Sequence, residues 1–404
     1  MSKIYYILVG CVAVLLLNNK CKTPEKTVSV PVVVEEEKPS APTLHLYQKQ
    51  VQYIPDSIST ITLSLVGDLM CHLPQTNNAE VGKGVYDFNS SFQYIKPYLQ
   101  SSDLTIGNLE TTFAGTSRPY AGYPAFNSPD AYCTALKNTG FDFLVTANNH
   151  SMDTQEDGLL RTIDVIKKNG LGYSGTYLNQ RDKDSIRILT IKGIHLGILN
   201  YTYGTNGSYP SNLHKYMLNV IDSTSITNDV KQAKRNGADI VLVFYHFGVE
   251  NIVEPTPAQK SAVQYALQAG AQLVIGAHPH VIGPSELAAS LNKTAFVAYS
   301  LGNFLSNQYW RYTDAGVILN LSIEKNFTHH TTSYKSADFI PTWVYRGDGS
   351  KKMHIIFPAQ LAEDSLKLPS FLTDSHRKKM LEAYNDTKLV LTKNNPHIKL
   401  FSVK

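Results

Sequence analysis

Short apolar runs recur along the middle of the chain, and each gives way to a small cluster of polar residues. Six such runs are Ile61–Val66, Leu104–Ile106, Phe143–Ala147, Ile240–Tyr245, Leu273–Ile275 and Phe296–Tyr299. Runs of this length and composition predict buried strands. The stretches between them predict helices at Ser91–Gln100, Ala131–Asn138, Gly158–Asn169, Ser223–Asn236 and Ala258–Ala269. The alternation predicts an α/β fold, with a largely parallel sheet and helices outside it.

Glycines mark the expected helix ends. Asn169-Gly170, Asn236-Gly237 and Gly270 predict left-handed caps. Beyond Tyr334 the pattern changes to strands at Phe339–Tyr345 and His354–Phe357 and a helix at Ser375–Leu389. We therefore expect a main domain over residues 62–324 and a small α+β C-terminal extension, residues 335–404, packed on it.

The N-terminus has the pattern of an export signal. Lys3 precedes the apolar run Ile4–Leu17, which is shorter than the roughly 20 residues of a membrane span. Residues 22–61 mix Pro, Glu, Lys and Val without a sustained period, which predicts a flexible tether. We expect residues 1–21 to direct export and to leave the protein tethered to the membrane on its extracytoplasmic side.

Two cysteines in the signal segment are candidates for lipid attachment. Cys11 ends a lipobox-like Leu8-Val9-Gly10, but would leave a short apolar core, whereas Cys21 follows the apolar run in the poor cleavage context Asn18–Lys20. A cleaved signal or an uncleaved anchor is an equal alternative. The body of the chain contains only Cys71 and Cys133, so no disulfide framework is evident.

Composition narrows the function classes. Of 404 residues, 43% are hydrophobic and 17% charged, which is typical of a globular protein with a sizeable core. The net charge is +4 and no long Lys/Arg stripe occurs, so charge does not indicate a nucleic-acid partner.

The polar clusters carry the chemistry. They are Gly67-Asp68, Gly107–Glu110, Asn148-Asn149-His150, His246–Glu250, Gly276–His280 and Ser300–Phe304. In open α/β sheets, ligands bind beyond the carboxyl ends of the strands. Asp, Glu, Asn and His side chains that arrive there together predict one metal site, assembled from segments far apart in the sequence.

Each candidate also has a structural alternative. Asp68 supplies a carboxylate or caps a helix, and Glu110 bridges two cations or lies in an exposed loop. Asn149 offers an amide oxygen to a metal and His150 protonates a leaving oxygen, with Asp153 close enough to orient it. The alternative for Asn148-Asn149-His150 is a turn satisfied by its own hydrogen bonds.

Three further histidines complete the candidate ligands. His246 ends the most hydrophobic strand, where a lone His is more often a core residue. His278 and His280 follow Gly276, and residues two apart in an extended segment face the same side. Mixed His, carboxylate and amide ligands suit Mn, Fe or Zn rather than Ca. Substrate contacts are expected from Asn108, Asn148, Glu250 and Asn303, although Asn303 also fits a tight turn.

Taken together, the six ordered motifs resemble the CapA capsule or poly-γ-glutamate synthesis proteins. The resemblance runs from about Thr62 to Phe304, and Pro341–Val344 is similar to a later segment of the family. It implies the fold of calcineurin-like metallophosphoesterases, in which stacked mixed β-sheets are flanked by helices.

The resemblance also implies roles and a divalent metal cofactor, two ions in the wider superfamily. Asp68, Glu110 and His280 would hold one ion. Glu110, Asn149, His246 and His278 would hold the other, with His150 as the leaving-group acid. Two positions depart from the superfamily pattern, because Met70 replaces a ligand His and Glu110 replaces a bridging Asp. We therefore expect the first ion to bind more weakly, because it loses the ligand at Met70. His72 lies nearby, but its spacing is wrong for a replacement ligand.

Two functions remain open. One is metal-dependent hydrolysis or transfer on a phosphoester or an amide-linked glutamyl chain of the envelope. The other is a non-catalytic protein that binds an anionic surface polymer. In both, the membrane at the N-terminus and other capsule-synthesis membrane proteins are the expected partners.

Overall fold

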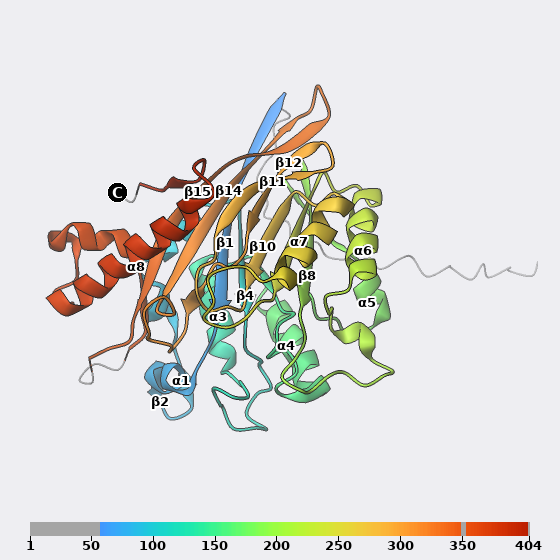
Figure 1. Ribbon diagram of the computed structural model, residues 1–404. Coiled ribbons are helices and arrows are strands. Elements are labelled where there is room, and N and C mark those ends of the chain that lie inside the picture. Colours follow the sequence, from blue (N-terminus) through green and yellow to red (C-terminus); the bar gives the residue numbers. More distant parts are fainter. Residues whose placement is uncertain (1–56, 349–352, 403–404) are drawn as a thin grey trace, which may run out of the picture. The chain divides into compact units, whose positions relative to one another are not determined.

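The computed structural model describes residues 57–348 and 353–402 (Figure 1). The predicted signal segment and the predicted tether up to residue 56 lie outside these ranges, and both stay predictions. Over the described ranges, no helix has both the length and the apolar character that crossing a membrane requires.

The first sheet has nine strands among the described residues, in the order β16-β15-β14-β1-β4-β5-β6, with β13 beside β1 and β17 beside β15. The strands β1, β4, β5, β6 and β13 run parallel, whereas β14, β15 and β16 are antiparallel neighbours. The bounds are β1 (Ile58–Leu69), β4 (Leu104–Leu109), β5 (Phe143–Val145), β6 (Gly172–Ser174), β13 (Asn303–Leu305), β14 (Ala315–Asn326), β15 (Thr331–Tyr345), β16 (Ile355–Pro358) and β17 (Lys399–Leu400).

The second sheet has six strands within the same described ranges, in the order β11-β12-β10-β9-β8-β7. Its four central strands are parallel and its two edge strands antiparallel. The bounds are β7 (Arg187–Ile191), β8 (Ile194–Thr202), β9 (Ile240–His246), β10 (Leu273–Ala277), β11 (Ser285–Ser290) and β12 (Lys293–Ala298). A small separate pair is β2 (Glu80–Gly82) with β3 (Val85–Tyr86).

The α-helices are α1 (Leu73–Ala79), α2 (Lys96–Gln100), α3 (Asp130–Thr139), α4 (Gln155–Lys168), α5 (Gln180–Asp184), α6 (Ser223–Arg235), α7 (Pro257–Ala269) and α8 (Asp374–Lys393). Short 3₁₀ turns cover Asn89–Phe92, Lys215–Met217, Ala359–Glu363 and Ser365–Lys367. The prediction of one helix over Ser91–Gln100 is wrong. Pro97 is tolerated only in the first turn of a helix, so α2 begins at Lys96.

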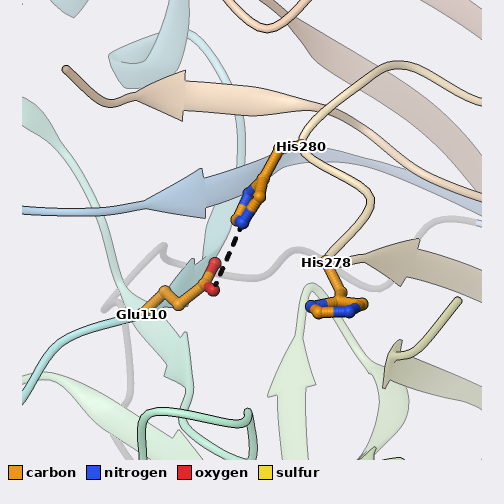
Figure 2. A group of neighbouring side chains, drawn as sticks. All are labelled: Glu110, His278 and His280. Atoms are coloured by element: carbon orange, nitrogen blue, oxygen red, sulfur yellow. Dashed lines mark ion pairs between the residues drawn. The ribbon is translucent and has the colours of Figure 1, made fainter. Parts of the chain in front are cut away.

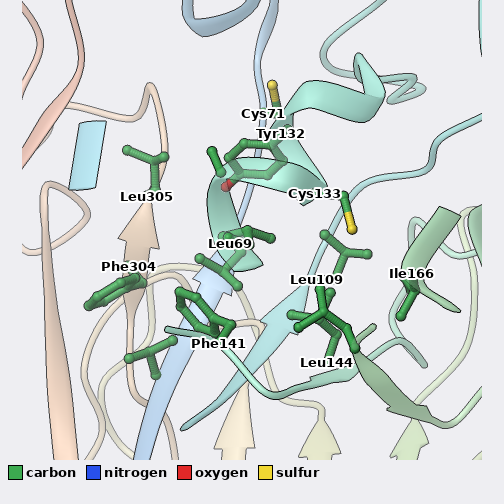
Figure 3. Packing of buried hydrophobic residues seen from close by; sticks show 14 of the residues in the cluster. Leu69, Cys71, Leu109, Tyr132, Cys133, Phe141, Leu144, Ile166, Phe304 and Leu305 are labelled. Carbon is green, nitrogen blue, oxygen red and sulfur yellow. The ribbon is translucent and has the colours of Figure 1, made fainter. Parts of the chain in front are cut away.

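The layers follow from the alternation of side chains along each strand. Leu63 and Leu65 of β1 face Leu242 and Phe244 of β9, in the core between the two sheets. On the outer face of the first sheet, Leu69, Leu109 and Leu144 pack beneath α3 and α4 (Figure 3). On the outer face of the second, Val241, Val243 and Tyr245 pack against α6 and α7. The expected α/β class, with stacked mixed sheets flanked by helices, is confirmed.

The left-handed caps are confirmed at Gly170, Gly237 and Gly270, with φ of 68°, 95° and 101°. The strands β6, β7, β8, β11 and β14 were not predicted from the sequence. Residues 335–404 contribute most of β15, all of β16 and β17, and α8. Their strands continue the first sheet by pairing directly with β14 and with one another.

Candidate metal centre

Close backbone approaches explain the glycines in two motifs. A Cβ added to Gly67 would lie 2.0 Å from the Gly302 carbonyl oxygen, and one added to Gly276 would lie 2.0 Å from the Tyr299 oxygen. The backbone N–H of Asp68 donates to that same Gly302 oxygen at 2.9 Å. Glycine therefore lets the loop 299–302 approach the ends of β1 and β10, which is where Asp68 and His278 emerge.

Five predicted ligands converge at the ends of β1, β4, β9 and β10. We call Asp68, Glu110, His246, His278 and His280 the inner cluster, and none of them is more than 3% exposed. Their ligand atoms form two groups, each spanning at most 4.8 Å: Glu110 with His278 and His280, and Glu110 with Asp68 and His246. Glu110 belongs to both groups, as a bridging carboxylate would.

Two imidazoles approach Glu110. Its Oε1 lies 3.6 Å from His246 Nε2. It also lies 3.9 Å from His280 Nε2 (Figure 2). Metal–ligand bonds of 2.0–2.1 Å place neighbouring tetrahedral ligands roughly 3.4 Å apart. The observed separations therefore leave room for a cation after a small contraction.

Several buried atoms of the inner cluster and of Asn108 beside it have no hydrogen-bond partner among the residues that the structure describes. They are both carboxylate oxygens of Glu110, His278 Nδ1 and Asn108 Oδ1. Buried polar atoms without a partner are rare in folded proteins and cost stability. Their concentration at one point, in a His and carboxylate donor set, fits a divalent cation.

The electrostatics agree with that interpretation. Burial, followed by the Asp68 charge, raises the pKa of Glu110 well above its usual value. Burial lowers the pKa of His246 well below its usual value and that of His278 to about 4. Both imidazoles are therefore neutral at pH 7, the protonation state that metal ligation requires.

Neighbouring groups set the direction of the imidazoles. His280 Nδ1 contacts Asp68 Oδ2 at 3.0 Å and Asn303 Oδ1 at 3.1 Å, which leaves Nε2 toward Glu110. Burial acts to lower the pKa of His280, but the hydrogen bond and charge of Asp68 outweigh it and raise that pKa. The amide Nδ2 of Asn108 donates to Asp68 Oδ1 at 2.8 Å and lies 3.1 Å from His246 Nδ1.

The expectation that His278 and His280 lie in an extended segment is wrong. Their φ angles are 98° and 59°, in the left-handed region. Such conformations cost about 1–3 kcal/mol for a non-glycine residue and cluster at functional sites. The turn, rather than strand alternation, directs both rings into the inner cluster.

The residues of the segment Asn148-Asn149-His150 have different roles. Asn149 Oδ1 lies 2.7 Å from His246 Nε2, at the border of the inner cluster. The amide of Asn148 donates to the Leu109 and Thr146 carbonyls and accepts from the N–H of His150. Asn148 thus holds the loop in place, with both of its amide hydrogens donated to backbone carbonyls.

The expected contact between His150 and Asp153 is present. His150 Nδ1 lies 2.7 Å from Asp153 Oδ2, which also accepts from the backbone N–H of Phe126 at 2.6 Å. The carboxylate therefore accepts the Nδ1 proton and fixes the ring so that Nε2 is turned away from Asp153.

A cleft of about 440 Å³ opens beside the inner cluster. Its walls include Tyr123–Ala125, Asn149, His150, Met152, Asp153, Asn206, Ser208 and Glu250. Glu250 is therefore placed where a substrate can reach it. Asn108 and Asn303, also expected at the substrate, are instead fully buried beside the ligands that they orient.

The first-strand departure is visible in the contacts. Met70 is buried, and its Sδ receives a contact from Ser306 Oγ at 3.7 Å. His72 Nδ1 is engaged by the backbone N–H of Asn307 at 3.3 Å, and Gln75 Oε1 lies 3.2 Å away. Within the described residues, His72 belongs to neither ligand group.

Three residues from β8 and the following loop were missed. Asn200 Oδ1 accepts from the N–H groups of Thr146 and Ala147, and its Nδ2 donates to the Phe244 carbonyl, which links the two sheets at the site. The ring of Tyr203 lies 4.7 Å from that of His278, and Asn206 contacts Asn149. The sequence contained a signal for these residues, because the polar cluster Tyr203–Gly207 follows the mostly apolar segment Ile194–Thr202.

The spatial groups do not separate the two ligand sets that the resemblance implied. Asp68 contacts His280, and Asn149 contacts His246, as those sets require. However, His246 also lies with Asp68, and His278 with His280. The residues form one continuous cluster around Glu110.

Comparison with known proteins places the chain in a family. The family model described as "Bacterial capsule synthesis protein PGA_cap" matches residues 62–308, which contain every member of the inner cluster. The chain belongs to this bacterial capsule synthesis family. The match also covers the cleft residues from Tyr123 to Glu250.

Relatives in the family include "Capsule biosynthesis protein CapA" of Bacillus anthracis, 26% identical over 84% of this chain and 79% of the relative. "PGA biosynthesis protein CapA" of Bacillus subtilis is 28% identical over 67% of this chain and 70% of the relative. Weaker similarity extends to the solved structure of the Haemophilus influenzae NAD nucleotidase NadN, with a TM-score of 0.45 and 11% identity over 86% of this chain and 58% of that one.

Proposed function

We propose that this protein is a metal-dependent hydrolase or transferase that acts on an envelope substrate during synthesis or attachment of an anionic capsule polymer. The observation that carries the proposal is the inner cluster, where unpartnered buried atoms of Glu110 and His278 face one point. A protein that only scaffolded other components would have no reason to retain this cost.

The ligands would be Asp68, Glu110, His246, His278 and His280, with Asn149 at the border, and we propose Mn, Fe or Zn as the metal. When bound, a divalent ion polarises a phosphoryl or carbonyl oxygen and lowers the pKa of a coordinated water. His280 is held by Asp68 and Asn303, so its Nε2 needs no rearrangement to act as a ligand.

His150 is the proposed proton donor to the leaving group. Its Nδ1 is held by Asp153, and its ring lies on the cleft wall beside Asn149. Nε2 is the nitrogen turned away from Asp153; when it carries a proton, the imidazolium would give that proton to the leaving oxygen of a substrate in the cleft and return to the neutral form.

The family suggests the biological setting. The relatives' names refer to capsule and PGA biosynthesis, which supports a phosphoester or an amide-linked glutamyl chain as the substrate. The signal-like N-terminus supports an exported protein tethered to the membrane, where other capsule-synthesis membrane proteins are candidate partners. Fatty-acid labelling of Cys11→Ser and Cys21→Ser variants, with fractionation, tests the anchor.

The function is tested on the full chain with three measurements. Metal content is measured after purification, turnover is measured on a phosphodiester and on a γ-glutamyl amide, and binding is measured to an anionic glutamyl polymer. We expect bound metal and metal-dependent turnover of one substrate. Tight polymer binding without turnover of either substrate would favour a non-catalytic binding protein.

A further inference from the structure

The loop after β8 brings Asn206 against two site residues. The backbone N–H of Asn206 donates to the Asn149 carbonyl at 3.1 Å, and Asn206 Oδ1 accepts from Asn149 Nδ2 at 3.3 Å. Asn206 Nδ2 lies 3.4 Å from His150 Nδ1. Asn206 therefore contacts both a candidate metal ligand and the proposed proton donor.

The contact with His150 is the weaker one. His150 Nδ1 is 2.7 Å from Asp153 Oδ2, so the proton on that nitrogen is donated to the carboxylate. A second donor cannot bond to the same nitrogen, and the 3.4 Å separation is a packing contact. The hydrogen bond of the Asn206 side chain is the one to Asn149.

That hydrogen bond has a consequence for metal binding. The two ends of an amide are alike in size, but only the oxygen accepts hydrogen bonds or ligates a cation. Asn149 Oδ1 faces His246 Nε2 at 2.7 Å, and Asn149 Nδ2 faces Asn206. We infer that Asn206 is a positioning residue that holds the Asn149 amide with its oxygen toward the metal.

Asn206 favours one orientation of the Asn149 amide because the opposite orientation costs free energy. If Asn149 rotated by half a turn, its Oδ1 would face Asn206 Oδ1, and two acceptors would oppose each other. Rotating Asn206 as well would only turn its Oδ1 toward a His150 Nδ1 proton that Asp153 already accepts. Its Nδ2 would then point into the cation site. Without Asn206 the two orientations become closer in energy, so part of the protein is unable to ligate. This inference rests on the proposed metal centre and does not require hydrolysis.

A double-mutant cycle with Mn²⁺ as the probe tests this inference on the full chain. Calorimetric titration compares the wild type, Asn206→Ala and Asn206→Asp, each in the normal and the Asn149→Ala background. Asp keeps an acceptor oxygen at the position of Oδ1, whereas Ala removes it. Tyr209→Phe is the matched control, because it changes an exposed hydroxyl on the same loop that contacts the Thr205 N–H at 3.4 Å.

We expect Asn206→Ala to raise the Mn²⁺ dissociation constant by about 10–100-fold, the range for partners that orient metal ligands. Asn206→Asp should bind at least as tightly as the wild type, and Tyr209→Phe should match it. In the Asn149→Ala background, Asn206→Ala should have no further effect.

Wild-type affinity in Asn206→Ala, or an equal loss in both backgrounds, would overturn the inference. Wild-type protein that binds no Mn²⁺ would overturn both the metal centre and this inference. By contrast, wild-type protein that binds Mn²⁺ and turns over no substrate would contradict the hydrolase alone, and the cycle would still decide the role of Asn206.

Discussion

The inner cluster and the cleft beside it differ in how far their polar groups are already paired with other residues. In the inner cluster, Glu110 and His278 are buried with unpaired atoms, and His278 has a left-handed φ of 98°. In the cleft, His150 and Asp153 are already paired at 2.7 Å, and Asn206 and Glu250 are exposed. The first region is incomplete without a ligand, whereas the second is complete before a substrate arrives.

This contrast separates binding from chemistry. Atoms that lack partners gain the most when a cation enters, so the inner cluster should control metal affinity. Groups that are held in one orientation are ready for proton transfer, so the cleft should control turnover. Replacing His150 should therefore lower turnover and leave metal affinity unchanged, whereas replacing an inner-cluster ligand should lower metal affinity and, through it, turnover.

The largest expected effect is on turnover. His150→Ala should lower metal-dependent hydrolysis by about 10²–10⁴-fold, the usual contribution of a positioned acid or base. Its Mn²⁺ dissociation constant should stay that of the wild type, because His150 lies outside both ligand groups. Steady-state kinetics and calorimetry on the same preparation check this, and a parallel loss of metal affinity would remove the distinction between the regions.

The next effect is on metal affinity. Glu110→Gln should weaken Mn²⁺ binding by about 100-fold or more, since Glu110 belongs to both ligand groups and even orienting partners contribute up to that amount. Without metal, the same variant should be more stable than the wild type, because an amide costs less to bury than an unpaired carboxylate.

For Glu110→Gln, titration with Mn²⁺ measures the loss of metal affinity, and thermal unfolding in the presence of a chelator measures the gain in stability of the metal-free protein. Glu324→Gln is the control and should leave metal affinity unchanged, because Glu324 pairs with Lys335 at 3.1 Å and lies beside Thr60, at the other end of β1 from Asp68. A Glu110→Gln protein with wild-type affinity would show that the two groups do not share a ligand.

A smaller effect concerns the close backbone approach between Gly67 and Gly302 beside the inner cluster. Gly67→Ala would place a Cβ 2.0 Å from the Gly302 oxygen and should lower the free energy of unfolding by about 1–3 kcal/mol, with weaker metal binding. The control is Gly82→Ala, where nothing lies within 4 Å of the added Cβ. Denaturant unfolding compares the two, and equal stability of both variants would refute the role assigned to the close approach.

The smallest effect tests the ring that covers the imidazoles. Tyr203 stacks on His246 at 6.4 Å and packs on His278 at 4.7 Å. Tyr203→Ala should weaken metal binding by about 10-fold or less, since aromatic pairs contribute about 0.5–1.5 kcal/mol. Tyr203→Phe keeps the ring and should match the wild type in titration. If Phe and Ala behave alike, the hydroxyl rather than the ring is the important group.

Strand-end chemistry explains how much of the site was predictable. A buried strand that ends in Asp68, Glu110 or His246 places a polar side chain at the sheet edge where ligands bind. The order of the motifs along the chain then indicated that these side chains belong to one site. The same rule, applied to Tyr203–Gly207 after β8, would have found Asn206. That cluster was not predicted because the preceding segment Ile194–Thr202 is interrupted by His195 and Asn200 and was not identified as a buried strand.

Local pattern by itself determined the α/β class, the buried strands that follow from apolar runs, such as β9, and the glycine caps of the helices, because these depend on near neighbours in the chain. It did not determine which acceptor each amide faces. Asn108 and Asn149 become orienting groups only when β1, β4 and β9 bring Asp68 and His246 beside them.

Tertiary structure likewise decided the turn at His278-Pro279-His280 and the task of Asn148. The Asp68 carboxylate of β1 accepts from the backbone N–H of His278 and contacts His280 Nδ1, which also contacts the Asn303 amide oxygen of β13; these side chains hold the turn in place. Asn148 is consumed by carbonyls of β4 and its own loop. Hydrogen bonds and close backbone approaches between distant segments depend on three-dimensional packing, which periodicity along the chain does not encode.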